Sequence, residues 1–227
     1  MITAAVRSRA DLLAYVPAAV TTTAAAMAGR SRMHLVSKLA LAPTLAAGVA
    51  ATRSTRTPGR TTTLLVALGG SLVGDWFMYR SDRAEGAISR QQMRLGASAF
   101  AVQQIGLIRT LLHDGARPRP VPSAAAAGVM GVLGLLDSDG GLPDPVLAGY
   151  GVLLGSMSAL AMGEGGPPRD RRGVVLGGAL FLLSDAAIIV GQQCASTPAR
   201  RAVADGVILS TYTAALALLV HGLRDDV

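Results

Sequence analysis

Charge and cysteine are both scarce in this chain of 227 residues. Only 15% of the residues are Asp, Glu, Lys or Arg, whereas a soluble domain typically carries about 25%. Cys194 is the single cysteine, which excludes an intrachain disulfide and a cysteine-based metal site. The three histidines are widely separated and form no HExxH-type motif. The sequence therefore predicts neither a bound metal nor an organic cofactor.

Lysine is nearly absent too. Lys38 is the only one, so the formal net charge of +7 comes almost wholly from arginine. The arginines are scattered over many loops and not gathered on one face, which argues against a nucleic-acid partner. Membrane topology accounts for them better. If eight spans cross the membrane, six of the arginines from Arg117 onward lie on the same side as the N-terminus, and two lie on the opposite side. This bias predicts cytoplasmic termini.

Long apolar runs are what the chain has in abundance. Hydrophobic residues make up 51% of it, and the runs approach the 17 to 25 residues, roughly, that a transmembrane helix needs. They are continuous and do not alternate, which favours helices over barrel strands. Eight spans are predicted at about residues 12–27, 33–51, 62–78, 95–112, 121–136, 145–162, 174–192 and 206–223.

The predicted fold class is therefore all-α: a polytopic transmembrane helix bundle. Residues 1–227 form a single transmembrane domain, because spans and short loops use up nearly the whole chain. Such a protein is multi-pass and integral to a membrane, the inner or plasma membrane in a bacterium. The longest connection, residues 80–94, mixes charges and is predicted to form a short interfacial helix. Three GxxxG pairs predict close helix packing within the bundle: Gly70-Gly74, Gly151-Gly155 and Gly173-Gly177.

Two aspartates interrupt these apolar runs. Asp75 lies in LLVALGGSLVGDWFM and Asp185 in VVLGGALFLLSDAAIIV. A carboxylate at that depth costs at least a few kcal/mol unless it is paired, hydrated or protonated. Chains that keep such residues usually use them for catalysis, ion transfer or helix packing. The carboxyls are thus the first candidates for function.

Other polar side chains accompany the two carboxyls. One hypothesis is a polar cavity lined by Lys38, Asp75, Gln104, Tyr150, Asp185 and Tyr212. Desolvation would keep one aspartate protonated, so that it acts as an acid. The alternative is structural: Lys38 pairs with one aspartate, and the other is neutral and hydrogen-bonded. Ser71 lies one turn before Asp75 on the same helical face, and Ser184 directly precedes Asp185.

These residues fall into motifs that match a known family in order and spacing over roughly residues 33–222. The motifs are Lys38 and Pro43 (KLALAP), Ser71, Gly74 and Asp75 (SLVGD), Gly96 and Phe100 (GASAF), Tyr150 with Ser156-Met157 (YGVLLGSMSA), Gly178, Phe181, Ser184 and Asp185 (GALFLLSD), and Tyr212. The sequence resembles the YhhN, or lysoplasmalogenase, family of integral membrane proteins.

The resemblance implies an eight-span enzyme that hydrolyses the vinyl-ether bond of lysoplasmalogens to a fatty aldehyde and a glycerophospho-base. Its substrate would be a membrane lysophospholipid, and its two intramembrane aspartates map onto Asp75 and Asp185 as catalytic residues. The accompanying polar residues become candidates for substrate binding: Lys38, Ser71, Gln104, Tyr150, Ser184 and Tyr212. A proton-coupled or small-molecule transporter is the alternative that the carboxyls allow, with Asp75 and Asp185 as a proton relay.

Three positions depart from the family's pattern. Gln104 stands where the family usually has histidine, Leu107 where it has tyrosine, and Leu216 where it has glutamine. An amide does not titrate, so Gln104 cannot replace a histidine as an acid or base. A family member that keeps the fold without the activity is the third hypothesis.

Overall fold

The computed structural model describes residues 10–137, 142–165, 170–194 and 197–224. These residues form eight α-helices and one short 3-10 turn, Arg53–Thr55, with no strand among them. The helices are α2 (Leu12–Met27), α3 (Ser31–Ala51), α4 (Pro58–Ser81), α5 (Gly86–His113), α6 (Pro120–Asp137), α7 (Pro145–Ala161), α8 (Arg171–Cys194) and α9 (Pro198–Leu223). The predicted all-α bundle is confirmed.

Proline and a preceding capping residue mark the starts of three helices. Pro58, Pro145 and Pro198 each occupy the first turn of a helix, where the missing N–H costs nothing. The residue before each proline caps the helix with a side-chain oxygen, as Asp144 does for the N–H of Val146 at 3.0 Å. Gly29, at φ 66°, makes the left-handed turn that closes α2 before α3 begins.

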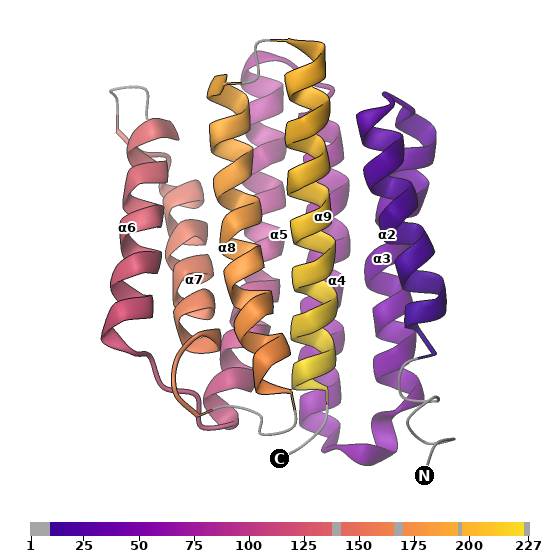
Figure 1. Cartoon of the computed structure of the whole chain (residues 1–227), viewed down its shortest axis with the longest axis vertical. Coiled ribbons are helices and arrows are strands. Elements are labelled where there is room, and N and C mark those ends of the chain that lie inside the picture. Colours follow the sequence, from indigo (N-terminus) through magenta and orange to yellow (C-terminus); the bar gives the residue numbers. More distant parts are fainter. Residues whose placement is uncertain (1–9, 138–141, 166–169, 195–196, 225–227) are drawn as a thin grey trace.

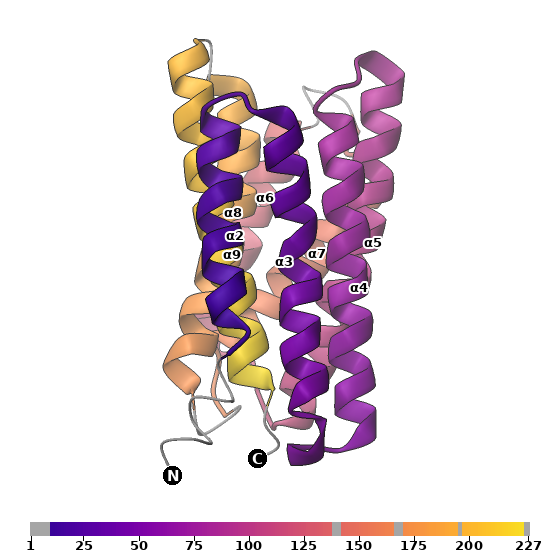
Figure 2. The ribbon, with the colours of Figure 1, turned by 90° about the vertical axis from the view of Figure 1, so that its right-hand side faces the viewer.

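Seven of the helices form a closed circuit. The neighbours in space are α2, α3, α4, α5, α7, α8 and α9, and α9 returns to α2, while α6 packs outside on α7 and α8. Figure 1 shows α6 at one edge of the bundle, and Figure 2 shows the α2–α3 hairpin between α9 and α4. A circuit of this kind leaves an interior that side chains from many helices reach.

Among the described residues, five helices are long and apolar enough to cross a membrane: α3, α4, α5, α9 and residues 171–191 of α8. Three further helices are apolar but shorter over the described residues, namely Leu12–Met27, Pro120–Val132 and Pro145–Ala161. Several helices extend beyond the predicted spans, since their polar end turns lie outside a hydropathy window. The predicted interfacial helix at residues 80–94 is wrong: α4 continues to Ser81 and α5 already begins at Gly86.

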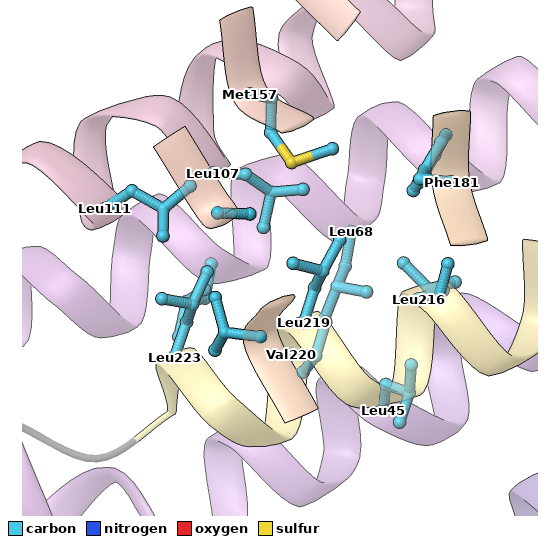
Figure 3. Packing of buried hydrophobic residues seen from close by; sticks show 14 of the residues in the cluster. Leu45, Leu68, Leu107, Leu111, Met157, Phe181, Leu216, Leu219, Val220 and Leu223 are labelled. Atoms are coloured by element: carbon cyan, nitrogen blue, oxygen red, sulfur yellow. The ribbon is translucent and has the colours of Figure 1, made fainter. Parts of the chain in front are cut away.

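An apolar core lies inside the bundle. Leu68, Leu107, Met157, Leu216 and Leu219 are among its almost fully buried members, and Figure 3 shows their side chains converging from α4, α5, α7 and α9. A buried salt bridge closes the same end of the bundle, where Asp114 accepts from Arg60 at 2.7 Å. The same core cluster includes Phe181 and Tyr212, which adjoin the buried polar residues.

Glycine lets α4 and α5 approach closely. A Cβ built at Gly70 would lie 2.6 Å from the carbonyl oxygen of Ala99, and one at Gly74 would lie 2.7 Å from the Phe100 ring. A Cβ at Gly177 would likewise lie 2.9 Å from the Leu219 side chain. These glycines pack helices within the bundle, as the GxxxG spacing predicts.

Candidate active site

Asp75 is buried within a hydrogen-bonded group from three helices. Its side chain is 1% exposed, and its Oδ1 lies 3.4 Å from Nζ of Lys38 on α3. The hydroxyl of Tyr212 on α9 donates to Oδ2 at 2.9 Å. Ser71 Oγ lies 2.7 Å from the same hydroxyl. Since Tyr212 has one proton and gives it to the carboxylate, Ser71 must be the donor to Tyr212.

Asp185 has a simpler environment on α8. The hydroxyl of Tyr150 on α7 donates to its Oδ2 at 2.6 Å. No ion pair to Asp185 is formed by the described residues. The two carboxyls therefore differ in one respect that matters for chemistry: a cation accompanies Asp75, and only a phenol accompanies Asp185. Pairs of carboxyls in unlike surroundings are how enzymes divide acid and base roles.

Aromatic rings connect the two carboxyl–tyrosine pairs. The centroid of the Phe100 ring lies 6.0 Å from that of Tyr212, edge to face, and 6.4 Å from that of Tyr150. Phe181 adds a second edge-to-face contact to Tyr212 at 5.7 Å. Such contacts fix ring orientation. The hydroxyls that bind the two carboxyls thus belong to one packed cluster and not to separate parts of the bundle.

Both carboxyls line one cavity of about 1470 Å³. Ligand pockets usually measure about 300 to 1000 Å³, so this volume suits a long molecule. One side of the cavity is apolar, with Met130 and Gly134 of α6 and Gly151 of α7. The other end is charged, with Lys38 and Asp82 among its lining residues. The cavity is therefore amphipathic, as a lipid is.

The structure brings most of the predicted site residues together. Lys38, Asp75, Tyr150, Ser184, Asp185 and Tyr212 all line the cavity. Ser71 does not, because it lies behind Tyr212. Ser184 donates to the backbone oxygen of Ile208 at 3.0 Å, so its hydroxyl joins α8 to α9.

Gln104 is the exception to the predicted lining. It is fully buried and is not among the lining residues. Its amide lies beside the Tyr150 hydroxyl but meets hydrogen-bond geometry with none of the described residues. Gln104 therefore lies outside the cavity lining, beside Tyr150.

The other two departures from the family pattern fall in the apolar core. Leu107 and Leu216 are both almost fully buried there, and Figure 3 shows both among the core side chains. Neither lines the cavity. The leucines thus strengthen packing at positions away from the two carboxyls, and they remove no polar group from the cavity wall.

Three acidic residues that line the cavity were missed by the sequence prediction: Asp144, which caps the start of α7, and Asp82 and Asp205. Asp82 caps the end of α4, and Asp205 lies within α9. Both line the charged end of the cavity, and both are exposed. The signal for Asp205 was present, since AVADGVILS is an apolar context like that of Asp75. It was missed because the predicted last span began one residue later, at 206.

Metal ligands do not cluster in the part of the chain that the structure describes: no group of three or more His, Cys, Asp or Glu side chains converges there. His34 instead lies 2.9 Å from Thr22 Oγ1 through its Nδ1. His221 lies near Asp11, with Nε2 at 3.3 Å from Oδ2. The described histidines thus have structural partners near helix ends.

Fold and cavity together define a multi-pass membrane protein, a helix bundle with two carboxyls facing an amphipathic interior. The sequence model of the YhhN family matches residues 33–223, and the chain belongs to the YhhN family. No curated protein and no solved structure matches the chain. The match extends from the start of α3 to the last residue of α9, and so includes every residue of the candidate site.

Proposed function

We propose that this protein is a lysoplasmalogenase-like hydrolase, which cleaves the vinyl-ether bond of a lysoplasmalogen within the membrane. One observation carries the proposal: Asp75 and Asp185 line the same cavity, and each accepts a hydrogen bond from a tyrosine. Membership of the YhhN family fits this activity. The size and amphipathic lining of the cavity suit a lipid with one chain.

The reaction needs an acid and a base. A proton is added to the β-carbon of the vinyl ether, which produces an oxocarbenium ion. Water then attacks the cationic carbon and loses a proton, and the resulting hemiacetal collapses to a fatty aldehyde and the glycerophospho-alcohol. A neutral carboxylic acid can supply the first proton, and a carboxylate can stabilise the cation and accept the proton from water.

The surroundings of the two carboxyls support a division of roles. Lys38 lies beside Asp75 and favours its ionised form, which suits the carboxylate that stabilises the cation and activates water. Asp185 has a phenol as its partner and no cation among the described residues. A membrane interior favours the neutral acid at such a position. Asp185 is therefore the proton donor in this proposal.

Aldehyde release from a lysoplasmalogen by the purified protein tests the function. Asp75→Asn and Asp185→Asn should each reduce turnover by at least about 10²-fold, the usual contribution of a general acid or base. Asp170→Asn is a matched control, because Asp170 caps α8 away from the cavity and asparagine caps as well.

Wild-type turnover by either carboxyl variant would remove that residue from the mechanism. A protein that releases no aldehyde, yet moves protons together with a solute across liposome membranes in a manner dependent on Asp75, would instead be the transporter that the carboxyls also allow. Absence of both activities in well-folded protein would identify a family member without catalysis.

A further inference from the structure

His34 is a buried, titratable side chain in the cavity wall that the proposed chemistry does not use. It lies in the first turn of α3, and its Nδ1 is 3.1 Å from the backbone oxygen of Thr22 on α2. A carbonyl oxygen can only accept a hydrogen bond, so Nδ1 must carry a proton. The lone pair of the neutral ring is therefore on Nε2, which is the basic atom.

The Thr22 hydroxyl supports the same assignment of the proton. It donates to the backbone oxygen of His34 at 3.3 Å, and it lies 2.9 Å from Nδ1. Because its one proton goes to the carbonyl, it can accept from Nδ1 as well. Nε2 forms no hydrogen bond or ion pair with the residues that the structure describes. The ring is thus held through one nitrogen, and its basic nitrogen is left for the cavity.

His34 lies one helical turn from the ion pair of Asp75. His34 and Lys38 are four residues apart on α3, and Tyr79 and Asp75 are four apart on α4, so each pair shares a helical face. The two helices are neighbours (Figure 2). The rings of His34 and Tyr79 have centroids 6.2 Å apart, and Lys38 Nζ lies 3.4 Å from Asp75 Oδ1. The imidazole therefore lies about 6 Å along the helix axis from that ion pair, toward the start of α3.

The proposed hydrolysis leaves a proton on Asp75 that has to be removed. Asp75 accepts this proton from the attacking water, and it must become a carboxylate again before the next substrate reacts. Its side chain is 1% exposed, so it does not exchange protons directly with the solvent. Lys38 pairs with Asp75 as an ammonium and has no lone pair with which to take the proton. A neutral imidazole one turn away has one.

We propose that His34 is the proton-transfer residue that returns Asp75 to its carboxylate after each turnover. The inference rests on the proposed function. The O–H bond of the Asp75 carboxylic acid breaks, and the proton passes through cavity water to Nε2 of His34. Nε2 then gives the proton to water at the charged end of the cavity. Solvent supplies the proton that Asp185 has lost, so the cycle gains and loses no net proton. His34 acts through Asp75 and touches no reacting atom.

The surroundings of His34 bear on how turnover depends on pH. Lys38 and Arg83 act on the ring electrostatically, and α2 contributes Thr22, which does not titrate. The charged groups that line this end of the cavity are Lys38 on α3, Asp82 and Arg83 at the end of α4, and Arg201 and Asp205 on α9. An imidazole ordinarily has a pKa of about 6.5. Protonation of Nε2 removes the acceptor, so turnover should fall as the ring becomes charged on acidification.

Two substitutions separate proton transfer from packing. His34→Asn places an amide N–H near the position of Nδ1, which keeps the bond to Thr22 and removes Nε2. His34→Ala leaves space for free imidazole. In dilute buffer, both variants should lower kcat for aldehyde release by at least about tenfold, less than the 10² or so of a base that acts directly, and leave KM unchanged. The acidic limb that His34 produces in the pH profile should be lost as well.

Added imidazole should restore turnover in His34→Ala and leave wild type unchanged. His113→Ala is the matched control, because His113 is exposed at the end of α5 and does not line the cavity. Wild-type kcat in His34→Asn, or a deficit in His34→Ala that imidazole does not reduce, would overturn the inference. Absence of aldehyde release by wild type would refute the proposed hydrolysis and this role of His34 together.

The protonation of the ring is tested without any substrate. Protein labelled with ¹⁵N-histidine is titrated in detergent by NMR, and His34→Asn identifies the signal of His34 among the three histidines. At high pH the ring should carry its proton on Nδ1, and it should gain a second proton on Nε2 between about pH 8 and pH 5. A ring protonated on Nε2 at high pH, or one that does not titrate in this range, would overturn the inference.

Discussion

The hydroxyl of Tyr212 lies between Ser71 and the carboxylate of Asp75. It donates to the carboxylate at 2.9 Å and lies 2.7 Å from Ser71 Oγ. Tyr212→Phe removes these two hydrogen bonds and keeps the ring, along with its edge-to-face contacts to Phe100 and Phe181. The substitution therefore separates hydrogen bonding from packing at this position.

The expected effect can be worked out from these contacts. A buried hydrogen bond to a charged group contributes about 1.5 to 3 kcal/mol. If the carboxylate uses this bond to stabilise the oxocarbenium-like transition state, its loss lowers kcat by roughly 10- to 150-fold. Stability should fall too, by about 1 to 3 kcal/mol, because Ser71 and Asp75 lose a buried partner.

Tyr15→Phe is the matched control for this loss of stability. The Tyr15 hydroxyl donates to the backbone oxygen of Thr213 at 2.7 Å, next to Tyr212 on α9, and forms no hydrogen bond to Asp75 or Asp185. Both variants should have a lower midpoint of thermal denaturation in detergent, and only Tyr212→Phe should release aldehyde slowly. Equal losses of activity in the two variants would refute the reasoning, since they would trace the effect to stability alone.

Three further predictions follow from other contacts. Lys38→Met should lower kcat and leave KM nearly unchanged, because Lys38 pairs with Asp75; an effect confined to KM would place Lys38 on the substrate phosphate instead. Burial alone would raise the pKa of Asp144. The hydrogen bond from Arg94, at 2.6 Å, and those from two backbone N–H groups outweigh burial and hold this pKa below its usual value. Asp144→Ala should therefore destabilise the protein by about 1 to 2 kcal/mol, and Asp144→Asn by less because it still caps α7. The deficit of Asp144→Asn relative to wild type should be present at neutral pH and should shrink as the pH falls below about 4, the usual pKa of an aspartate. It should disappear once the pH has fallen through the lowered pKa of Asp144 in the folded protein; a deficit independent of pH in denaturation curves would contradict the ion pair. Prolonged EDTA or phenanthroline treatment should leave aldehyde release intact, and a loss that zinc restores would point to a metal site.

The helix bundle could be predicted from the sequence because a helix that crosses a membrane requires features that are visible along the chain. Continuous apolar runs, prolines at helix starts and glycine pairs each reflect a local requirement of the backbone. The connection between α4 and α5 was predicted wrongly because its charged residues resemble those of a separate surface helix. Its charges indicated a membrane surface, but charged residues can also extend a helix beyond the apolar layer, as the first turns of α5 do.

The candidate site was harder to predict in detail. Asp75 and Asp185 were evident from their apolar neighbours, but which polar residues face the cavity depends on helix rotation. Gln104 and Tyr150 illustrate this limit. Both lie within apolar helices and both looked like lining residues, yet only Tyr150 reaches the cavity. The rotation of α5 is set by tertiary contacts with α4 and α7, which no periodicity in its own sequence records.

The close approach at Gly74 has a consequence for how this chain tolerates mutation. A Cβ at that position would lie 2.7 Å from the ring of Phe100, which in turn packs against the tyrosines of both carboxyls. One added methyl group would therefore disturb two hydroxyls contributed by two other helices. Gly74, the glycine of SLVGD, is therefore restricted by the small space around it and not by a chemical role. In a saturation scan it should be as intolerant as the aspartate beside it, although it has no functional group of its own.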